Sequence, residues 1–147
     1  MSFLVLDANV AAKWCVKEKD SDIAVALLAN QDLLFIAPDI FLSEVANALL
    51  RQHRLGQLGK DELDRALDDL TITSPELVAS SSLMKDAVDL AVEIDHPVYD
   101  CLDLALAARS EMNLVTADRE FAEKCRRRLA ASSLVDKIQL LDSFAAS

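Results

Sequence analysis

Glycine, proline and cysteine are all scarce in this sequence, and each shortage excludes a class of protein. The chain has two glycines and three prolines in 147 residues, so it holds no flexible linker or low-complexity tract of the kind that these residues build. Its three cysteines, Cys15, Cys101 and Cys125, lie far apart and form no C-x-x-C pair. This pattern indicates neither a disulfide framework nor a zinc site. We expect one domain over residues 1–147, with buried thiols.

Long apolar runs are also missing, although hydrophobic residues make up 52% of the chain. No run approaches the roughly 20 residues that a membrane-spanning helix needs, and the stretch from Cys101 to Ala108 is interrupted by Asp103. The first residues carry no basic segment and reach a carboxylate at Asp7, unlike a signal peptide. We therefore expect a cytoplasmic protein without membrane contact, some of whose apolar surface serves a partner.

Basic residues are outnumbered, with 15 Lys and Arg against 25 Asp and Glu and a net charge of -10. This balance argues against nonspecific binding to phosphate backbones. Two considerations reduce the objection. Acidic residues that surround metal ions are neutralised by them, and local basic groups occur at Arg51, His53 and Arg54 and between Arg119 and Arg128.

Short apolar runs alternate with amphipathic patterns along the chain. The expected strands are Phe3–Leu6, Leu33–Ile36, a short one from Ile72, Leu114–Thr116 and Ile138–Leu141. The expected helices cover about Ala11–Trp14, Ser21–Asn30, a segment after Pro38 that carries Glu44, Lys60–Leu70, a segment starting at Ser74–Glu76, Leu83–Ile94 and Pro97–Arg109. Such alternation predicts an α/β fold with a central, mainly parallel sheet and helices on both faces, and a site outside the carboxyl ends of the strands.

Four carboxylates stand where charges are least expected. Asp7 and Asp118 follow apolar strands, whereas Glu44 and Asp100 project from apolar helix faces. Several buried carboxylates together need a cation, and a ligand set without His or Cys favours Mg²⁺ or Mn²⁺ over zinc. Such a site suits phosphodiester hydrolysis with one or two metal ions.

Each residue of this set also has an ordinary structural interpretation. Asp7 and Asp118 are suitable helix N-caps, and Glu44 and Asp100 suit the edge of a solvated helix face. The coincidence of all four favours the metal site. His53 and His96 are interpreted as surface histidines, and Arg126–Arg128 as a solvated helix face or a grip for phosphates.

Four segments carry a resemblance to a known family. They are L-D-A-N at Leu6–Asn9, S-E-V-A-N-A-L at Ser43–Leu49, Y-D-C-L-D-L-A-L-A at Tyr99–Ala107 and V-T-A-D-R-E-F at Val115–Phe121. In this order and spacing the sequence resembles the PIN domain, specifically the VapC-like toxins of VapBC toxin–antitoxin pairs. The resemblance implies a PIN-like three-layer sandwich and a Mg²⁺-dependent endoribonuclease, with Mn²⁺ as the alternative ion. Its catalytic and metal-binding residues would be Asp7, Glu44, Asp100 and Asp118, supported by Asn9 and Thr116.

The resemblance also implies partners. The substrate would be transfer, ribosomal or messenger RNA, and a VapB-like antitoxin would place its C-terminal segment in the groove near the acidic residues. We expect a homodimer, and a heterotetramer or larger assembly with the antitoxin. One position departs from the family, because Asp103 stands where an aromatic residue is usual. Asp103 shares a helical face with Asp100, so it is either a fifth acidic group of the metal site, which we favour, or a solvent-facing residue.

Two other functions are compatible with the pattern. A noncatalytic PIN-like binding module would use the same fold but has no need of the intact acidic set. A receiver-type phosphotransfer domain also places carboxylates at strand ends, but it requires a lysine at a later strand end. Thr116 suits its hydroxyl position, yet no strand-end lysine is present.

Overall fold

The computed structural model describes residues 2–145 and is built on one sheet. Its five strands lie in the order β3-β2-β1-β4-β5, and all neighbouring strands are parallel. The strands are β1 (Ser2–Leu6), β2 (Leu33–Pro38), β3 (Glu76–Val78), β4 (Asn113–Thr116) and β5 (Ile138–Leu140). The α/β class and the parallel sheet that the sequence predicts are confirmed.

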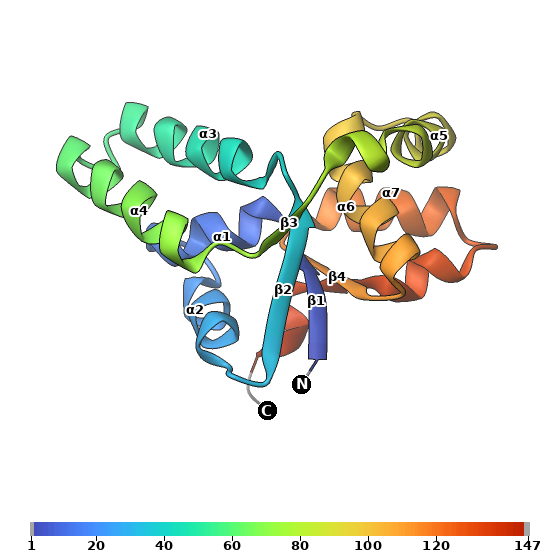
Figure 1. Cartoon of the computed structure of the whole chain (residues 1–147), viewed down its shortest axis with the longest axis horizontal. Helices are drawn as coiled ribbons and strands as arrows, with labels where there is room; N and C mark the ends of the chain where they lie inside the picture. Colours follow the sequence, from blue (N-terminus) through green and yellow to red (C-terminus); the bar gives the residue numbers. More distant parts are fainter. Residues whose placement is uncertain (1, 146–147) are drawn as a thin grey trace.

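Helices cover both faces of this sheet. They are α1 (Ala8–Cys15), α2 (Ser21–Ala29), α3 (Phe41–Arg54), α4 (Lys60–Thr73), α5 (Met84–Ile94), α6 (Val98–Ser110) and α7 (Arg119–Arg128), with short 3-10 turns at Ser80–Ser82, Ser133–Lys137 and Leu141–Phe144. Figure 1 shows α1 to α4 on one side of the strands and α5 to α7 on the other. Among residues 2–145, no helix has the length and apolar character needed to cross a membrane.

The central strand β1 divides the core into two parts. Successive side chains of a strand point to opposite faces. Leu4 and Leu6 accordingly pack into the core under α1 to α4, whereas Val5 packs into the core under α5 to α7. All three are buried, which accounts for the unbroken apolar run in the sequence.

The third strand is not where the sequence analysis placed it. Ile72 belongs to α4 and is 83% exposed, and the strand comprises Glu76–Val78. Pro75 disfavours a helical conformation at the residue before it. Ser74 is extended, with φ -57° and ψ 139°, so the helix ends at Thr73 and the chain continues as an edge strand. The expected strand from Ile72 and the expected helix from Ser74 are therefore wrong.

Candidate metal centre

The carboxyl ends of β1 and β4 meet where the strand order reverses. The chain continues from β1 into α1 on one face and from β4 into α7 on the other. Leu6 is in register with Val115, so Asp7 and Thr116 follow at the same level of neighbouring strands. A crevice at such a switch point is the usual ligand position in open α/β sheets.

Asp7 and Asp118 each end a strand segment and begin a helix. The backbone N–H of Asn9 donates to Asp7 Oδ1 at 3.2 Å, and that of Phe121 donates to Asp118 Oδ1 at 3.0 Å. Both residues are thus side-chain N-caps, of α1 and α7 respectively. The capping interpretation is correct for both, and it leaves room for a ligand because an ionised carboxylate has further lone pairs.

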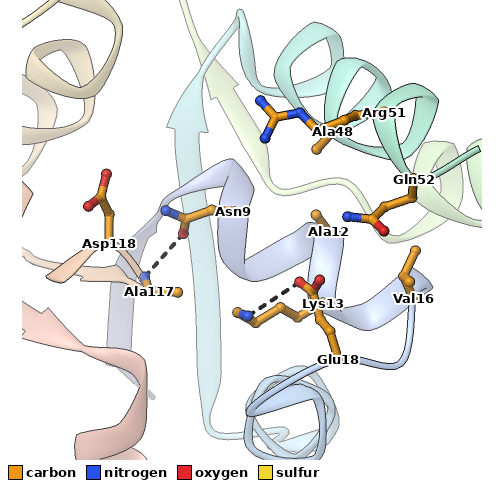
Figure 2. Close-up of a pocket in the computed structure, with 10 residues that line it drawn as sticks. All are labelled: Asn9, Ala12, Lys13, Val16, Glu18, Ala48, Arg51, Gln52, Ala117 and Asp118. Atoms are coloured by element: carbon orange, nitrogen blue, oxygen red, sulfur yellow. Dashed lines mark hydrogen bonds and ion pairs between the residues drawn. The ribbon is translucent and has the colours of Figure 1, made fainter. Parts of the chain in front are cut away.

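Thr116 and Asn9 connect the two strand ends. The buried Thr116 hydroxyl donates to Asp7 Oδ2 at 2.8 Å and accepts from the backbone N–H of Asp118 at 3.1 Å. Asn9 Nδ2 donates to the same hydroxyl at 3.4 Å. Asn9 Oδ1 accepts from the backbone N–H of Ala117 at 3.1 Å (Figure 2). These bonds hold the Asp7 carboxylate and the backbone that carries Asp118.

Helix α6 brings two further carboxylates to this point. It begins at Val98, directly after Pro97, and every residue from Cys101 to Ala107 is buried. Asp100 and Asp103 lie three residues apart and therefore share a face of the helix. One carboxylate oxygen from each of Asp7, Asp100 and Asp103 lies within 4.8 Å of the other two. We call these three residues the inner cluster.

Burial and mutual repulsion disfavour negative charge in the inner cluster. Asp7 is 3% and Asp103 2% exposed. Burial, followed by the charge of Asp100, raises the pKa of Asp7 to about 7. Burial and the charges of Asp7 and Glu44 hold the pKa of Asp103 well above its usual range. Full ionisation of the cluster at neutral pH therefore requires a compensating cation.

Glu44 and Asp118 flank the inner cluster, and we call them the outer carboxylates. Both are half-buried, and neither belongs to the group of oxygens within 4.8 Å. Burial and the charge of Asp7 raise the pKa of Glu44 to about 7. The charge of Asp118 contributes to the raised pKa of Asp7. Of the four carboxylates singled out in the sequence, the structure brings Asp7 and Asp100 together.

Asp103 supplies the most direct test of whether a metal ion fits. Its Oδ2 atom is buried and has no hydrogen-bond partner among residues 2–145. Within the same range, no lysine or arginine forms an ion pair with the inner cluster. An unpaired buried carboxylate oxygen is costly, and donors that are all oxygen suit Mg²⁺ or Mn²⁺. The residues fit such an ion.

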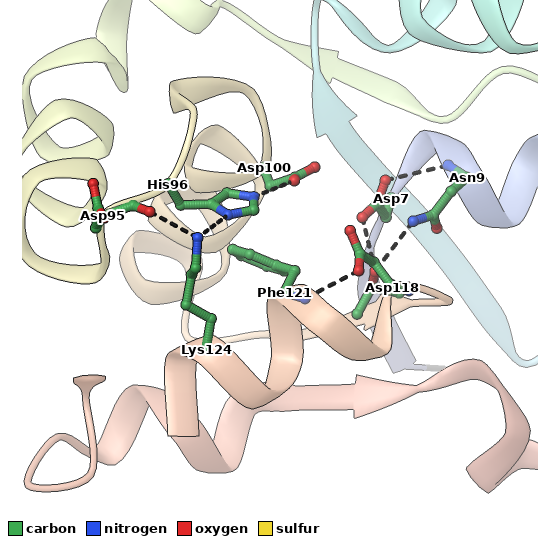
Figure 3. A network of polar contacts seen from close by, with 9 residues as sticks. Asp7, Asn9, Asp95, His96, Asp100, Asp118, Phe121 and Lys124 are labelled. Carbon is green, nitrogen blue, oxygen red and sulfur yellow. Dashed lines mark hydrogen bonds and ion pairs between the residues drawn. The ribbon is translucent and has the colours of Figure 1, made fainter. Parts of the chain in front are cut away.

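His96 belongs to this site, and the expectation of a surface histidine is wrong. Its side chain is 13% exposed, and its Nε2 lies 2.6 Å from Asp100 Oδ2 (Figure 3). Asp95 ends α5 in the left-handed region, with φ 55°, and this turn directs the chain back toward the sheet. The spacing of four residues between His96 and Asp100 was the available signal, but Pro97 between them suggested a turn at the surface.

A parallel α/β sheet with carboxylates at its switch point defines a class of protein that binds its ligand through acidic oxygen donors. The chain belongs to the PIN domain family, whose model matches residues 4–127.

One curated relative supports this assignment, and two solved structures share the fold. It is 35% identical over 123 residues to Ribonuclease VapC3 of Pyrobaculum aerophilum, a match that covers 82% of this chain and 93% of the relative. The crystal structure of PAE2754 from the same organism superposes with a TM-score of 0.68 at 20% identity, covering 97% of this chain and 92% of the other. A toxin–antitoxin complex from Klebsiella pneumoniae contains a chain that superposes with a TM-score of 0.59 at 15% identity, with coverages of 94% and 97%. The resemblance to VapC proteins is confirmed.

Proposed function

We propose that this protein is a Mg²⁺- or Mn²⁺-dependent endoribonuclease that acts as the toxin of a type II toxin–antitoxin pair. The observation that carries the proposal is the inner cluster, which includes the unpartnered Asp103 oxygen, in a chain related to a ribonuclease over most of its length. Carboxylates buried together without a protein cation favour a divalent ion over a purely structural role.

Each residue of the site has a role that follows from its position. Asp7, Asp100 and Asp118 hold one or two ions, and Asp103 adds an oxygen from the buried side of the cluster. Glu44 completes the ligand set or orients the attacking water. Thr116 holds the Asp7 carboxylate, and Thr116 and Asn9 together hold the backbone N–H groups of Ala117 and Asp118 through their hydrogen bonds.

Divalent ions in such a site make water a better nucleophile at neutral pH and neutralise charge on the phosphate and the leaving oxygen. The oxygen of water forms a bond to phosphorus while the bond from phosphorus to the 3′ oxygen breaks. A proton from the water ends on that 3′ oxygen. The products are a 5′-phosphate and a 3′-hydroxyl.

The toxin role includes the partners that the family resemblance implies. The substrate is transfer, ribosomal or messenger RNA in the cytoplasm. A VapB-like antitoxin covers the groove beside the acidic residues, and two copies of this chain form a homodimer within the larger complex. The toxin–antitoxin complex among the structural relatives supports an antitoxin partner.

The test is cleavage of a mixed RNA pool by antitoxin-free protein, with Mg²⁺, with Mn²⁺ and with chelator. We compare the wild-type chain with Asp100→Asn and with Asp89→Asn, which changes an exposed carboxylate on α5. The proposal predicts cleavage that requires metal, is lost in Asp100→Asn and is retained in Asp89→Asn. If folded wild-type protein neither cleaves RNA nor binds metal, the noncatalytic binding module becomes the better account.

A further inference from the structure

A polar cavity opens directly beside the acidic site. It has a volume of about 510 Å³ and lies between α1, α3 and the segment that joins β4 to α7. Asn9 and Asp118, which belong to the site, form one wall, and Arg51 and Gln52 of α3 form another (Figure 2). The volume is within the range of small-ligand pockets, so the cavity has room for a nucleotide next to the metal centre.

Arg51 is the cation that this cavity offers to a ligand. Lys13 also lines it, but its ammonium group donates to Lys19 O at 2.9 Å and pairs with Glu18 at 3.3 Å. Arg51 is exposed and forms no ion pair among residues 2–145. A guanidinium group matches the geometry of a phosphate and binds it through two N–H donors.

Two other basic residues near the site already have partners within the protein. Arg119 pairs with Asp142, and Lys124 donates to the backbone carbonyl of Asp95 at 2.7 Å. Among residues 2–145, Arg51 is thus a cavity-lining cation that no carboxylate pairs with, and in a chain with a net charge of -10 such a cation favours the approach of a phosphate at this point.

We propose that this cavity binds the nucleotide adjacent to the scissile phosphate, with Arg51 on the flanking phosphate and the Gln52 amide facing the base or sugar. This inference rests on the proposed ribonuclease function. Asn9 lines the pocket but has a structural role there, because both the nitrogen and the oxygen of its amide are already hydrogen-bonded within the protein. The Gln52 side chain forms no hydrogen bond in residues 2–145 and is available to the ligand.

The experiment measures binding of a fluorescent single-stranded RNA 12-mer of randomised sequence by anisotropy, with Ca²⁺ as a divalent ion that limits turnover. The variants are Arg51→Ala and Arg51→Lys, with Arg54→Ala as the matched control on the same helix but outside the cavity. We expect Arg51→Ala to weaken binding about tenfold and to reduce the salt slope by about one counterion. Arg51→Lys should restore the slope and only part of the affinity, and Arg54→Ala should change binding less than twofold.

The outcomes separate this subsite from the proposed function. Equal effects of Arg51→Ala and Arg54→Ala in a protein that still cleaves RNA would overturn the subsite and leave the ribonuclease intact. A wild-type chain that neither binds nor cleaves RNA would overturn both. Unchanged RNA binding together with lost affinity for an acidic peptide would assign the cavity to a protein partner and contradict the nucleotide.

A second inference comes from a separate set of contacts around Asp100. Lys124 Nζ lies 3.4 Å from His96 Nδ1, and His96 Nε2 lies 2.6 Å from Asp100 Oδ2 (Figure 3). The imidazole also packs on the ring of Phe121, with centroids 4.9 Å apart. An ammonium group only donates hydrogen bonds, so Nδ1 accepts and the ring proton resides on Nε2. Nε2 therefore donates to the carboxylate.

We infer that His96 and Lys124 are positioning residues for Asp100. Together they hold one oxygen of its carboxylate, and the other has no hydrogen bond in the described part of the chain and is available to an ion. Residues that orient a metal ligand typically contribute about 10- to 100-fold to metal affinity. We expect a contribution of about this size from His96 and Lys124.

The test is the Mn²⁺ dissociation constant, measured by electron paramagnetic resonance on the full chain. His96→Phe keeps an aromatic ring against Phe121 but removes the donor, His96→Gln keeps a donor, and Lys124→Met removes the ammonium group. Arg128→Met, at an exposed position of α7, is the control. We expect about tenfold weaker binding for His96→Phe and Lys124→Met, substantial rescue by His96→Gln and no effect of Arg128→Met. Wild-type affinity in folded His96→Phe would overturn the inference, as would equal losses in His96→Phe and His96→Gln.

Discussion

The inner cluster and the outer carboxylates occupy one site but differ in their burial and in their hydrogen-bond partners. The outer residue Asp118 is half-buried and caps α7 by accepting the backbone N–H of Phe121. In the inner cluster, Asp103 is 2% exposed and its Oδ2 has no hydrogen-bond partner among residues 2–145. The contacts of Asp118 are thus those of an ordinary helix cap, whereas the unpaired buried oxygen of Asp103 has no such structural explanation. A charge buried in this way indicates a ligand that the chain itself does not supply.

The largest effect should come from removing one charge from the inner cluster. We expect Asp100→Asn to lower RNA cleavage by about 10³-fold, since a bound ion contributes several kcal/mol to stabilisation of the transition state. Asp118→Asn should cost about tenfold, because Asp118 lies outside the inner cluster, and asparagine keeps one carbonyl oxygen for the ion and still caps the helix N-terminus. Single-turnover cleavage rates at saturating Mg²⁺ give both values. Equal losses in the two variants would remove the distinction between inner and outer carboxylates.

Asp103→Asn should separate stability from metal binding. Without metal, folding at neutral pH requires Asp103 to take up a proton, because its pKa in the folded protein lies well above the usual range. Asparagine removes this cost, so the melting temperature of the variant should rise above that of the wild type. With Mn²⁺, the wild type should gain stability, and the variant should gain clearly less because its metal affinity is about 10- to 100-fold lower. Thermal unfolding with chelator and with Mn²⁺ measures both. If Asp103 were only a neutral buried acid, the two proteins would respond to Mn²⁺ alike.

The carboxylates of the two groups were not equally predictable from the sequence. The strands before Asp7 and Asp118 were predictable because apolar runs of a parallel sheet are short and uninterrupted, and the site followed from where they end. The nearly complete burial of Asp103 could not be predicted from the sequence. Periodicity placed it on the face of Asp100, but only the packing of α6, buried along its middle on all sides, decides that this face is closed to solvent.

The contact between His96 and Asp100 depends on a backbone conformation that could not be predicted from the sequence. A residue other than glycine in the left-handed region is uncommon, yet Asp95 adopts it and redirects the chain. The error at Ile72 has the opposite origin. There Pro75 is a sufficient local signal for the end of the helix at Thr73, and a single apolar residue such as Ile72 does not indicate a strand.

The metal-free protein should become less stable as pH rises from about 4 to 7. The pKa of Asp7 is about 7 in the folded state against an ordinary value of 3.8. The folded state therefore holds more protons than the unfolded state between about pH 4 and pH 7, and the free energy of unfolding falls as pH rises across that window. The Asp7 contribution is fully present below the lower value and lost above the upper one.

Urea unfolding of chelated protein from pH 5 to pH 8 measures this dependence, with Asp7→Asn as the reference that lacks the titrating group. The wild-type curve should decline relative to the reference, and saturating Mn²⁺ should reduce or reverse the decline because the ion favours the ionised cluster. Parallel curves for wild type and Asp7→Asn would show that Asp7 does not carry a raised pKa.

The smallest effect should come from the hydrogen bonds that join the inner cluster to Asp118. Thr116→Val keeps the shape of a fully buried side chain but removes the hydroxyl that serves Asp7 and the backbone of Asp118. We expect a loss of about 1–3 kcal/mol in the free energy of unfolding, the range for leaving buried polar groups unpaired. Thr71→Val, at an exposed position of α4, should cost less than about 0.5 kcal/mol. A Thr116→Val loss no larger than this control would contradict the structural role of the hydroxyl.

The central claim is that the inner cluster is a binding site for a divalent cation. Calorimetric titration of the antitoxin-free wild-type chain with Mn²⁺ near pH 6.5, in two buffers of different ionisation enthalpy, tests it most directly. We predict saturable binding of one or two ions with release of protons, because the pKa values of Asp7 and Glu44 are both about 7 before the ion enters. Folded protein that binds no Mn²⁺, or binds it without releasing protons, would contradict the account.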